Sequence, residues 1–308
     1  MLRLGLIGAG RWGKVYIRTI EGMAPRLKIA RIATSRPENS WKELVASPDC
    51  DAVIIATPAP LHAEMVRACL EAGKPCIAEK PLCFDTATAR ALKEQADKTR
   101  LPVLVNYVHL YNPGYRALKK AVASAGKPVR AILTEGMDLG PFRTDTGALW
   151  DRCPHDVALC LDLMDGAGSV SDLSAAGAFP DAQGRPEMVT LRLAWKGGAT
   201  AWIHAGRLSP QKKRTVSVIT DTALFHFDEQ AAIKCRKIPF DYTGRAGLGS
   251  GPLPKEGEPL PVPERPTPME GMLSAFADQA EKKSPSNGLG LTVELTRVLE
   301  ECAKLLKV

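Results

Sequence analysis

The feature that most constrains this chain is a glycine-rich turn placed directly between a predicted strand and a predicted helix. Residues 2–7 (Leu-Arg-Leu-Gly-Leu-Ile) have the apolar character of a buried strand, and residues 8–13 (Gly-Ala-Gly-Arg-Trp-Gly) follow at once. The G-x-G-x-x-G spacing permits a tight turn close to a ligand, and the next helix presents free N–H groups to a pyrophosphate. We therefore predict a dinucleotide-binding turn rather than a glycine-rich turn without a ligand. The predicted contacts are Gly8, Gly10, Arg11, Trp12 and Gly13.

Strand-like and helix-like segments alternate through residues 1–125. Residues 51–56 (Asp-Ala-Val-Ile-Ile-Ala) are almost continuously apolar, which is typical of a parallel strand covered on both faces. Asp85 can cap one helix, and Pro113 can open another at its first position. Further strands are predicted at residues 27–33, 75–78 and 101–105. The alternation predicts an α/β fold, a Rossmann domain with a doubly wound parallel sheet over residues 1–125.

The pattern changes in residues 126–308, where strand-like stretches follow one another between Gly and Asp turns. A helix is predicted near residues 154–163 and a helical tail over residues 269–306. Residues 240–268 are rich in Pro, Gly and Glu and are predicted to form a surface loop. The strand-like stretches are residues 189–195, 200–206, 215–219 and 224–227. We predict an α+β second domain with an open, mostly antiparallel sheet, used for substrate binding and oligomerisation.

Composition excludes several classes of protein. The chain has 308 residues, enough for two domains, and its net charge of +7 suits an anionic ligand. An aromatic content of 6% argues against a stacking platform for single-stranded nucleic acid, and because no nucleic-acid motif accompanies the basic run Lys212-Lys213-Arg214, we expect no nucleic-acid partner. No apolar run reaches the ~18 residues of a membrane span. Eight scattered cysteines without a C-x-x-C pair predict no metal site and a reducing compartment. A strand that begins at residue 2 leaves no room for a signal peptide, so we expect a cytoplasmic protein.

The end of the second predicted strand bears on the choice of cofactor. An acidic residue there would bind the ribose 2′-hydroxyl of NAD, but the chain has Thr34-Ser35-Arg36. Ser35 and Arg36 can bind a 2′-phosphate, so we predict NADP as the preferred cofactor, with NAD as the alternative. In the other interpretation, Arg36 is solvated beside a pocket that accepts both. Trp12 either packs over the cofactor or holds the start of the helix.

Candidate reacting groups stand at ends of predicted elements. Lys80 follows the strand at residues 75–78, at the sheet edge where ligands bind in such folds, although a lysine at a strand end is ordinarily solvated. His155 can exchange a proton near neutral pH, or can cap or pack at a helix start. Asp151 stands four residues earlier, on the same face if the stretch is helical, and can orient a substrate hydroxyl or pair with Lys80. Tyr107 and His109 follow the strand at residues 101–105 and either line a substrate pocket or belong to the core.

Several motifs together resemble the Gfo/Idh/MocA family of oxidoreductases over most of the chain. They are the glycine turn, Ala56-Thr57-Pro58, His62, Glu79-Lys80-Pro81, Asn112-Pro113 and the pair Asp151 and His155. The resemblance implies Lys80, Asp151 and His155 as the catalytic set. The chain departs from the family pattern at Cys153, where glycine is common, and at Ala59, where asparagine is common. These departures affect the start of the catalytic helix and one cofactor contact.

The resemblance also implies a function. We expect hydride transfer between a nicotinamide and a secondary alcohol or ketone of a sugar, nucleotide sugar or cyclitol, in a homodimer or homotetramer built through the open sheet. His155 would act as acid or base, Lys80 would polarise the reacting oxygen, and Asp151 would position it. Two alternatives stay open: a same-fold reductase of a non-sugar substrate, and a non-catalytic nucleotide-binding sensor. The cofactor residues expected outside the turn are Ser35, Arg36, Thr57, Pro58, Glu79 and His62, the last as a support of the loop.

Overall fold

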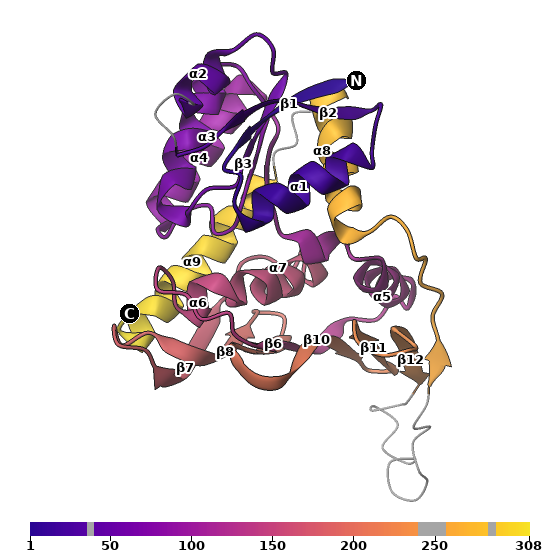
Figure 1. Ribbon diagram of the computed structural model, residues 1–308. Coiled ribbons are helices and arrows are strands. Elements are labelled where there is room, and N and C mark those ends of the chain that lie inside the picture. Colours follow the sequence, from indigo (N-terminus) through magenta and orange to yellow (C-terminus); the bar gives the residue numbers. More distant parts are fainter. Residues whose placement is uncertain (36–39, 240–256, 283–287) are drawn as a thin grey trace, which may run out of the picture. The chain divides into compact units, whose positions relative to one another are not determined.

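The computed structural model describes residues 1–35, 40–239, 257–282 and 288–308. By contacts the chain divides into two compact units, each formed from two stretches of the sequence. The first unit comprises Met1–Val108 and Pro266–Arg297, and the second comprises His109–Arg265 and Val298–Val308. This division differs from the two consecutive segments expected from the sequence, because C-terminal residues join the first unit. The colour gradient of Figure 1 follows the chain through both units.

The first unit contains a parallel sheet with the strand order β2-β1-β3-β4-β5. Its strands are β1 (Leu2–Ile7), β2 (Leu27–Ala33), β3 (Ala52–Ile55), β4 (Cys76–Ala78) and β5 (Val103–Val105). Every residue of β3 is buried, as its continuous apolar run predicts. The chain leaves β1 toward β2 and returns to β3 on the other side, so the carboxyl end of β1 is a switch point of the sheet. The predicted Rossmann sheet is confirmed.

Helices pack against this sheet, and several begin at the residues expected. Asp85 caps α4, since its Oδ1 accepts a bond of 2.7 Å from the backbone N–H of Thr88. The short helix α2 was not expected from the sequence. The helical elements of the unit are α1 (Arg11–Glu21), α2 (Trp41–Ala46), η1 (Ala59–Leu61), α3 (His62–Glu71), α4 (Thr86–Thr99), α8 (Pro268–Lys282) and the first part of α9 (Leu289–Leu306).

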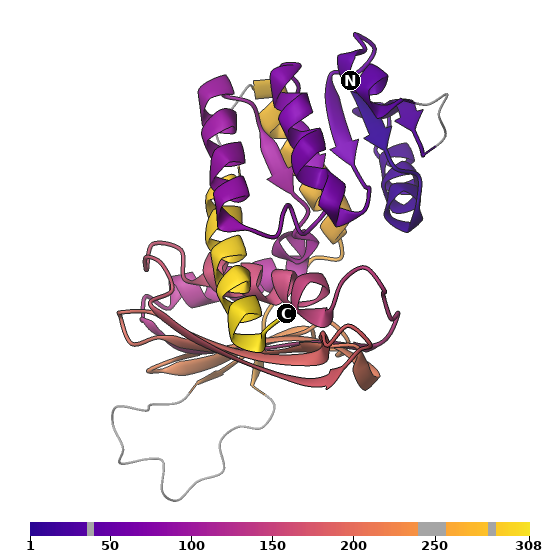
Figure 2. The ribbon, with the colours of Figure 1, turned by 90° about the vertical axis from the view of Figure 1, so that its left-hand side faces the viewer.

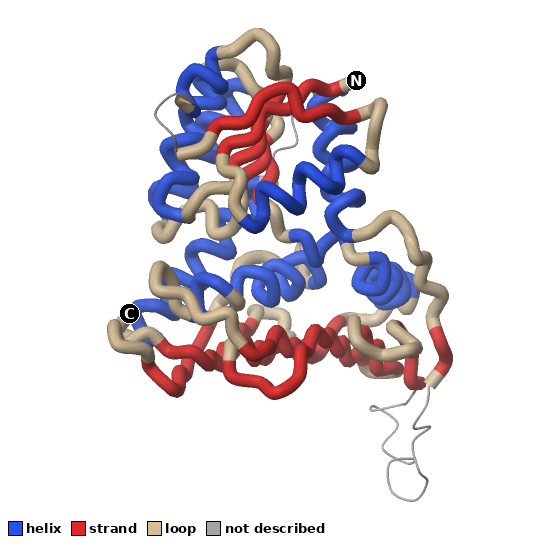
Figure 3. Tube along the Cα trace, in the orientation of Figure 1, coloured by secondary structure: helices blue, strands red, loops and turns tan. Residues whose placement is uncertain are grey.

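The second unit contains an eight-stranded sheet with the order β13-β12-β11-β10-β6-β9-β8-β7. All neighbouring strands are antiparallel except β6 and β9, so the predicted mostly antiparallel sheet is confirmed. The strands are β6 (Val129–Leu139), β7 (Asp172–Pro180), β8 (Pro186–Ala194), β9 (Thr200–Gly206), β10 (Leu208–Thr220), β11 (Ala223–Asp228), β12 (Cys235–Pro239) and β13 (Glu258–Pro259). Figure 3 shows these strands in red.

Helices cover one face of this sheet (Figure 2). Along β11, buried and half-buried residues alternate, which is typical of a sheet with one face in the core. Asn112 caps α5 by accepting a bond of 2.8 Å from the backbone N–H of Gly114. The helical elements are η2 (Val108–Tyr111), α5 (Pro113–Ser124), α6 (Ala148–Asp151), α7 (Cys153–Leu163) and the end of α9.

The sequence patterns missed several elements of the second unit. β6, β7, β12 and β13 were not expected, and the pairing of β6 with both β9 and β10 is what places β6 inside the sheet. Most of the surface loop expected at residues 240–268 lies outside the described residues, and β13 stands in the part that is described. Among the described helices, none combines the length and apolar character required to cross a bilayer.

Candidate active site

The glycine turn lies at the switch point of the first-unit sheet. Gly8 has a φ of +97°, and a Cβ atom there would lie 2.5 Å from the carbonyl oxygen of Ala56. A Cβ atom on Gly13 would lie 2.1 Å from the carbonyl oxygen of Gly8. These two glycines therefore allow the turn, the loop after β3 and helix α1 to pack closely. A Cβ atom on Gly10 would meet no heavy atom within 4 Å, so the turn is open on that side.

The start of α1 suits an anionic ligand. Gly10 is its N-cap residue and provides no side chain to bond the first N–H groups, and the first turn carries no acidic residue. Arg11 and Trp12 are exposed, with 37% of Trp12 accessible. At the end of β2, Ser35 is exposed and Thr34 is half-buried. Arg36 lies outside the described residues, so the predicted contact with a 2′-phosphate stays a prediction.

His62 joins two loops at the carboxyl edge of the sheet. Its side chain is 1% exposed. Its Nε2 atom lies 2.8 Å from the carbonyl oxygen of Thr57, and its Nδ1 atom lies 2.8 Å from that of Pro81. The loop after β3 is thus connected to the loop that carries Lys80. Pro58 is exposed beside Thr57, and Ala59, at the position where asparagine is common, is buried at the start of η1.

Glu79 and Lys80 follow β4 directly and have different environments. Lys80 is half-buried and precedes a cis peptide bond to Pro81. Glu79 is 5% exposed, and its Oε1 accepts hydrogen bonds from Asn106 Nδ2 at 2.7 Å and from Tyr16 Oη at 3.1 Å. Burial raises the pKa of Glu79, whereas the bond from Asn106 and the charge of Lys80 oppose that rise. The residue expected to contact the cofactor is therefore engaged with side chains of the core.

Two site residues expected from the sequence meet in the second unit. The rings of His109 in η2 and His155 in α7 stand edge to face, with centroids 4.7 Å apart and planes at 84°. Cys153 and Pro154 are buried at the start of α7, so the cysteine at the usual glycine position packs in the core. His155 is 9% exposed. Lys80 belongs to the first unit, and Asp151 and His155 belong to the second.

Tyr107 belongs to the core of the first unit. It is 3% exposed, and its backbone N–H donates to the carbonyl oxygen of Val105 at 2.7 Å. Burial raises the pKa of its phenol well above the ordinary tyrosine range. Of the two interpretations of the residue, the described environment favours the core over the lining of a pocket.

Asp151 is held by arginines. Its Oδ2 accepts bonds from Arg207 Nη2 at 3.1 Å and Nε at 3.3 Å, and Arg143 and Arg152 approach its carboxylate at 3.8 and 3.7 Å. Arg207 is fully buried and also donates to Glu187 at 3.1 Å. Arg207 connects the end of α6 to β8. Sequence reasoning missed it because its two carboxylate partners stand 20 and 56 residues away.

A second buried ion pair fixes the helix that carries His155. Asp156 is fully buried, and Arg214 Nη1 donates to its two oxygens at 2.8 and 2.9 Å. Burial raises the pKa of Asp156, and the Arg214 charge and bond oppose that rise. A Cβ atom on Gly136 of β6 would lie 2.1 Å from Asp156 Oδ2, so the glycine provides the space for the pair. The pair attaches α7 to β10 and was not expected from the sequence.

Arg207→Met should lower the free energy of unfolding by about 3–5 kcal/mol, because the carboxylates of Asp151 and Glu187 would lose a buried cation. Urea denaturation of the purified protein measures this loss. Arg130→Met is the matched control, since Arg130 pairs with Asp221 at 2.9 Å but is 51% exposed, and its loss should change the free energy of unfolding little because water screens an exposed pair. If Arg207→Met lowered the free energy of unfolding as little as the control does, Arg143 and Arg152 would be enough to compensate the charge of Asp151.

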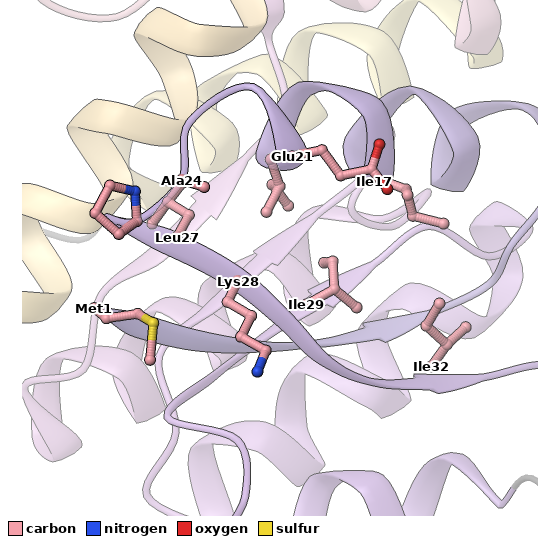
Figure 4. Close-up of a pocket in the computed structure, with 10 residues that line it drawn as sticks. Met1, Ile17, Glu21, Ala24, Leu27, Lys28, Ile29 and Ile32 are labelled. Atoms are coloured by element: carbon pink, nitrogen blue, oxygen red, sulfur yellow. The ribbon is translucent and has the colours of Figure 1, made fainter.

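A separate cavity of about 600 Å³ lies between α1 and β2 of the first unit (Figure 4). Its lining is mainly aliphatic, with Glu21 and Lys28 as the charged side chains. None of the described residues that the sequence predicts for the site lines this cavity. The remaining lining residues are Met1, Ile17, Ile20, Ala24, Pro25, Leu27, Ile29 and Ile32. The candidate site is therefore the carboxyl edge of the sheet and not this cavity.

Known proteins resemble this chain in sequence and in fold. Residues 2–107 match a family model described as an oxidoreductase family with an NAD-binding Rossmann fold. A solved structure of a putative oxidoreductase from Magnetospirillum magnetotacticum MS-1 is 34% identical, with a TM-score of 0.84 over 98% of this chain and 99% of that chain. UDP-N-acetylglucosamine 3-dehydrogenase GnnA from Acidithiobacillus ferrooxidans is 19% identical, with a TM-score of 0.78 over 99% of this chain and 96% of that chain, and shares the fold.

Curated relatives match over part of their length. Inositol 2-dehydrogenase from Rhizobium meliloti is 30% identical over 134 residues, which are 39% of this chain and 40% of the relative. The first three curated relatives are matched over 40%, 66% and 54% of their own length. The first unit therefore has an NAD-binding Rossmann fold, matched up to residue 107.

Proposed function

Because the chain belongs to the Gfo/Idh/MocA family of oxidoreductases, we propose that it is an NAD(P)-dependent dehydrogenase or reductase acting on a CH–OH group. The observation that carries the proposal is the glycine turn at the switch point of the sheet, open at Gly10 and followed by an uncapped helix start. These are the properties that a pyrophosphate requires. The turn therefore fits a nicotinamide dinucleotide.

The proposed substrate is a sugar, a nucleotide sugar or a cyclitol with a secondary alcohol or ketone. An inositol dehydrogenase among the relatives and a nucleotide-sugar dehydrogenase among the structures of the same fold support this class. A panel of sugars, nucleotide sugars and inositols, followed by the absorbance of the reduced cofactor, tests it. Turnover of at least one compound is expected. If every compound fails and the cofactor still binds, the function is that of a sensor or of a reductase for another substrate.

The proposed mechanism assigns one task to each residue of the catalytic set. The nicotinamide, when bound, accepts or supplies the hydride. His155 takes the hydroxyl proton during oxidation and returns it during reduction. Lys80 donates a hydrogen bond to the reacting oxygen as its charge changes. Asp151, whose Oδ2 is held by Arg207, orients the substrate hydroxyl. Thr57, with His62 behind it, supports the cofactor.

NADP should bind more tightly than NAD, because Ser35 and Arg36 stand where an acidic residue would select NAD. A charge-assisted bond to the 2′-phosphate favours NADP by roughly tenfold or more. Arg36→Ala should reduce the ratio of the two dissociation constants in isothermal titration by about the same factor. Arg18→Ala, which removes one exposed charge from α1, is the control and should leave the ratio unchanged. Equal or tighter binding of NAD by the wild type would contradict the prediction.

We also propose a homodimer or homotetramer in the cytoplasm. Leu133 of β6 and Trp202 of β9 are paired in the sheet and are 41% and 39% exposed, which gives the open face an apolar patch suited to a second copy. All eight cysteines are buried thiols outside disulfides, as is usual in a reducing compartment.

A further inference from the structure

Three buried side chains from three elements meet at Glu79. Tyr16 comes from α1, Glu79 follows β4, and Asn106 follows β5. Tyr16 is fully buried, Asn106 is 1% exposed and Glu79 is 5% exposed. Asn106 Nδ2 donates to Glu79 Oε1 at 2.7 Å and to Tyr16 Oη at 2.9 Å, and Tyr16 Oη donates to the same Glu79 oxygen at 3.1 Å. We call these residues the Glu79 triad.

Each donor of the triad has a defined use. The two N–H groups of Asn106 serve Glu79 and Tyr16, and the single O–H of Tyr16 serves Glu79. A closed set of three bonds in a buried environment restricts all three side chains, because breaking one bond leaves a buried polar group unsatisfied. The orientation of the Glu79 carboxylate is therefore set by α1 and by the segment after β5.

The backbone around Glu79 is also held on both sides. The N–H of Glu79 donates to the carbonyl oxygen of Ile55 at 2.9 Å, and the N–H of Asn106 donates to that of Ala78 at 2.8 Å. Glu79 thus continues the sheet by one residue, and Lys80 is the first residue beyond it. Tyr16 lies one turn after the glycine turn of α1. The triad connects the helix of the dinucleotide turn to the residue that precedes Lys80.

Burial and the polar partners of Glu79 act on its pKa in opposite directions. Burial raises its pKa, and the bonds from Asn106 and Tyr16 together with the charge and the backbone N–H of Lys80 lower it. Burial and the Glu79 charge keep the pKa of Tyr16 well above its usual range, so its phenol remains a donor. Tyr16 and Lys80 are the titratable groups that act on Glu79 from the elements packed against it. Loss of either bond therefore favours the protonated acid.

We propose that Glu79 is a positioning residue, held by Tyr16 and Asn106, that fixes the backbone and the electrostatic environment of Lys80 and does not contact the cofactor. The inference rests on the proposed function and replaces the expectation that Glu79 binds the dinucleotide. It gives Tyr16 and Asn106 a role in the reaction that acts only through Glu79 and Lys80. In this proposal catalysis requires the ionised carboxylate, because its negative charge is part of the environment of Lys80.

Tyr16→Phe tests the triad by removing one oxygen while keeping the ring. With the best substrate from the panel, kcat should fall about tenfold, the effect of one buried bond to a charged group. KM and the dissociation constant of NADP, from isothermal titration, should change less than about threefold. The ¹³C titration of the Glu79 carboxyl should move upward by about one pH unit, because a donor to the charged form is lost.

Tyr115→Phe is the matched control. Tyr115 is 1% exposed, and its phenol donates to Asp162 Oδ2 at 2.6 Å in the second unit. The substitution removes the same oxygen from a part-buried bond to a carboxylate. The Glu79 titration should stay at its wild-type position, and kcat should stay within about twofold of the wild type. A shift equal to that of Tyr16→Phe would mean a general loss of stability and would overturn the proposal.

Glu79→Gln separates positioning from cofactor binding. It keeps the shape and a hydrogen-bonding oxygen but removes the charge. NADP affinity should stay within about threefold and kcat should fall at least tenfold. A loss of NADP affinity above tenfold would show that Glu79 contacts the cofactor, and wild-type kcat in Glu79→Gln would show that Lys80 does not depend on it. If the wild type turns over no compound, the proposed function fails, while the binding and ¹³C measurements still decide where Glu79 acts.

Discussion

His155→Asn should slow oxidation of the alcohol by about 10²–10⁴-fold, the usual contribution of general acid–base catalysis. The wild-type rate should rise with pH through the range in which histidine ordinarily titrates, about 6–7.5. Asparagine keeps a polar group of similar size beside the ring of His109, whose centroid lies 4.7 Å from that of His155, but it cannot titrate. The rising limb of the pH–rate profile should therefore disappear in the variant. Steady-state oxidation rates across this pH range measure both effects.

The control for this variant is His204→Asn. His204 is exposed on β9 and hydrogen-bonds to Thr190 at 3.0 Å, so the same chemical change there should leave the rate and the pH profile as in the wild type. If His155→Asn retains the rising limb, another group such as Lys80 takes the proton. Tyr107 is a poor candidate for that role, because burial raises the pKa of its phenol.

Lys80→Ala should lower turnover by at least about 10²-fold, because it removes a donor that acts on charge developing at the reacting oxygen. The dissociation constant of NADP should change by less than about tenfold, since a contact made mainly in the transition state contributes little to cofactor binding. Single-turnover rates at saturating cofactor separate the chemical step from binding.

Lys93→Ala provides the comparison for Lys80→Ala. Lys93 forms an exposed ion pair with Asp97 at 2.6 Å on α4 of the same unit, and such pairs contribute about 0–1 kcal/mol. Its removal should leave turnover unchanged. Near-wild-type turnover in Lys80→Ala would identify Lys80 as a surface lysine. The segment Glu79-Lys80-Pro81 would then have no part in the proposed reaction.

Local signals in the sequence predicted the first unit well. The strand at Leu2–Ile7, the turn and the helix from Arg11 were expected because glycine conformations and helix starts depend on neighbouring residues. The continuous apolar run of β3 and the N-cap at Asp85 also depend only on neighbouring residues, so they too could be predicted. In the second unit, β6 was not predicted because many of its side chains are only partly buried. It forms a strand because its backbone pairs with β9 and β10.

The sequence by itself determined the sheet of the first unit, the place of the dinucleotide turn and the identity of the candidate reacting residues, Lys80 and His155. Only the tertiary structure decided what holds those residues. Arg207 reaches Asp151 across 56 positions, Arg214 reaches Asp156 across 58, and Tyr16 reaches Glu79 across 63. A buried charge requires a partner, but strand register and helix packing select which distant side chain provides it. That selection leaves no local pattern in the sequence.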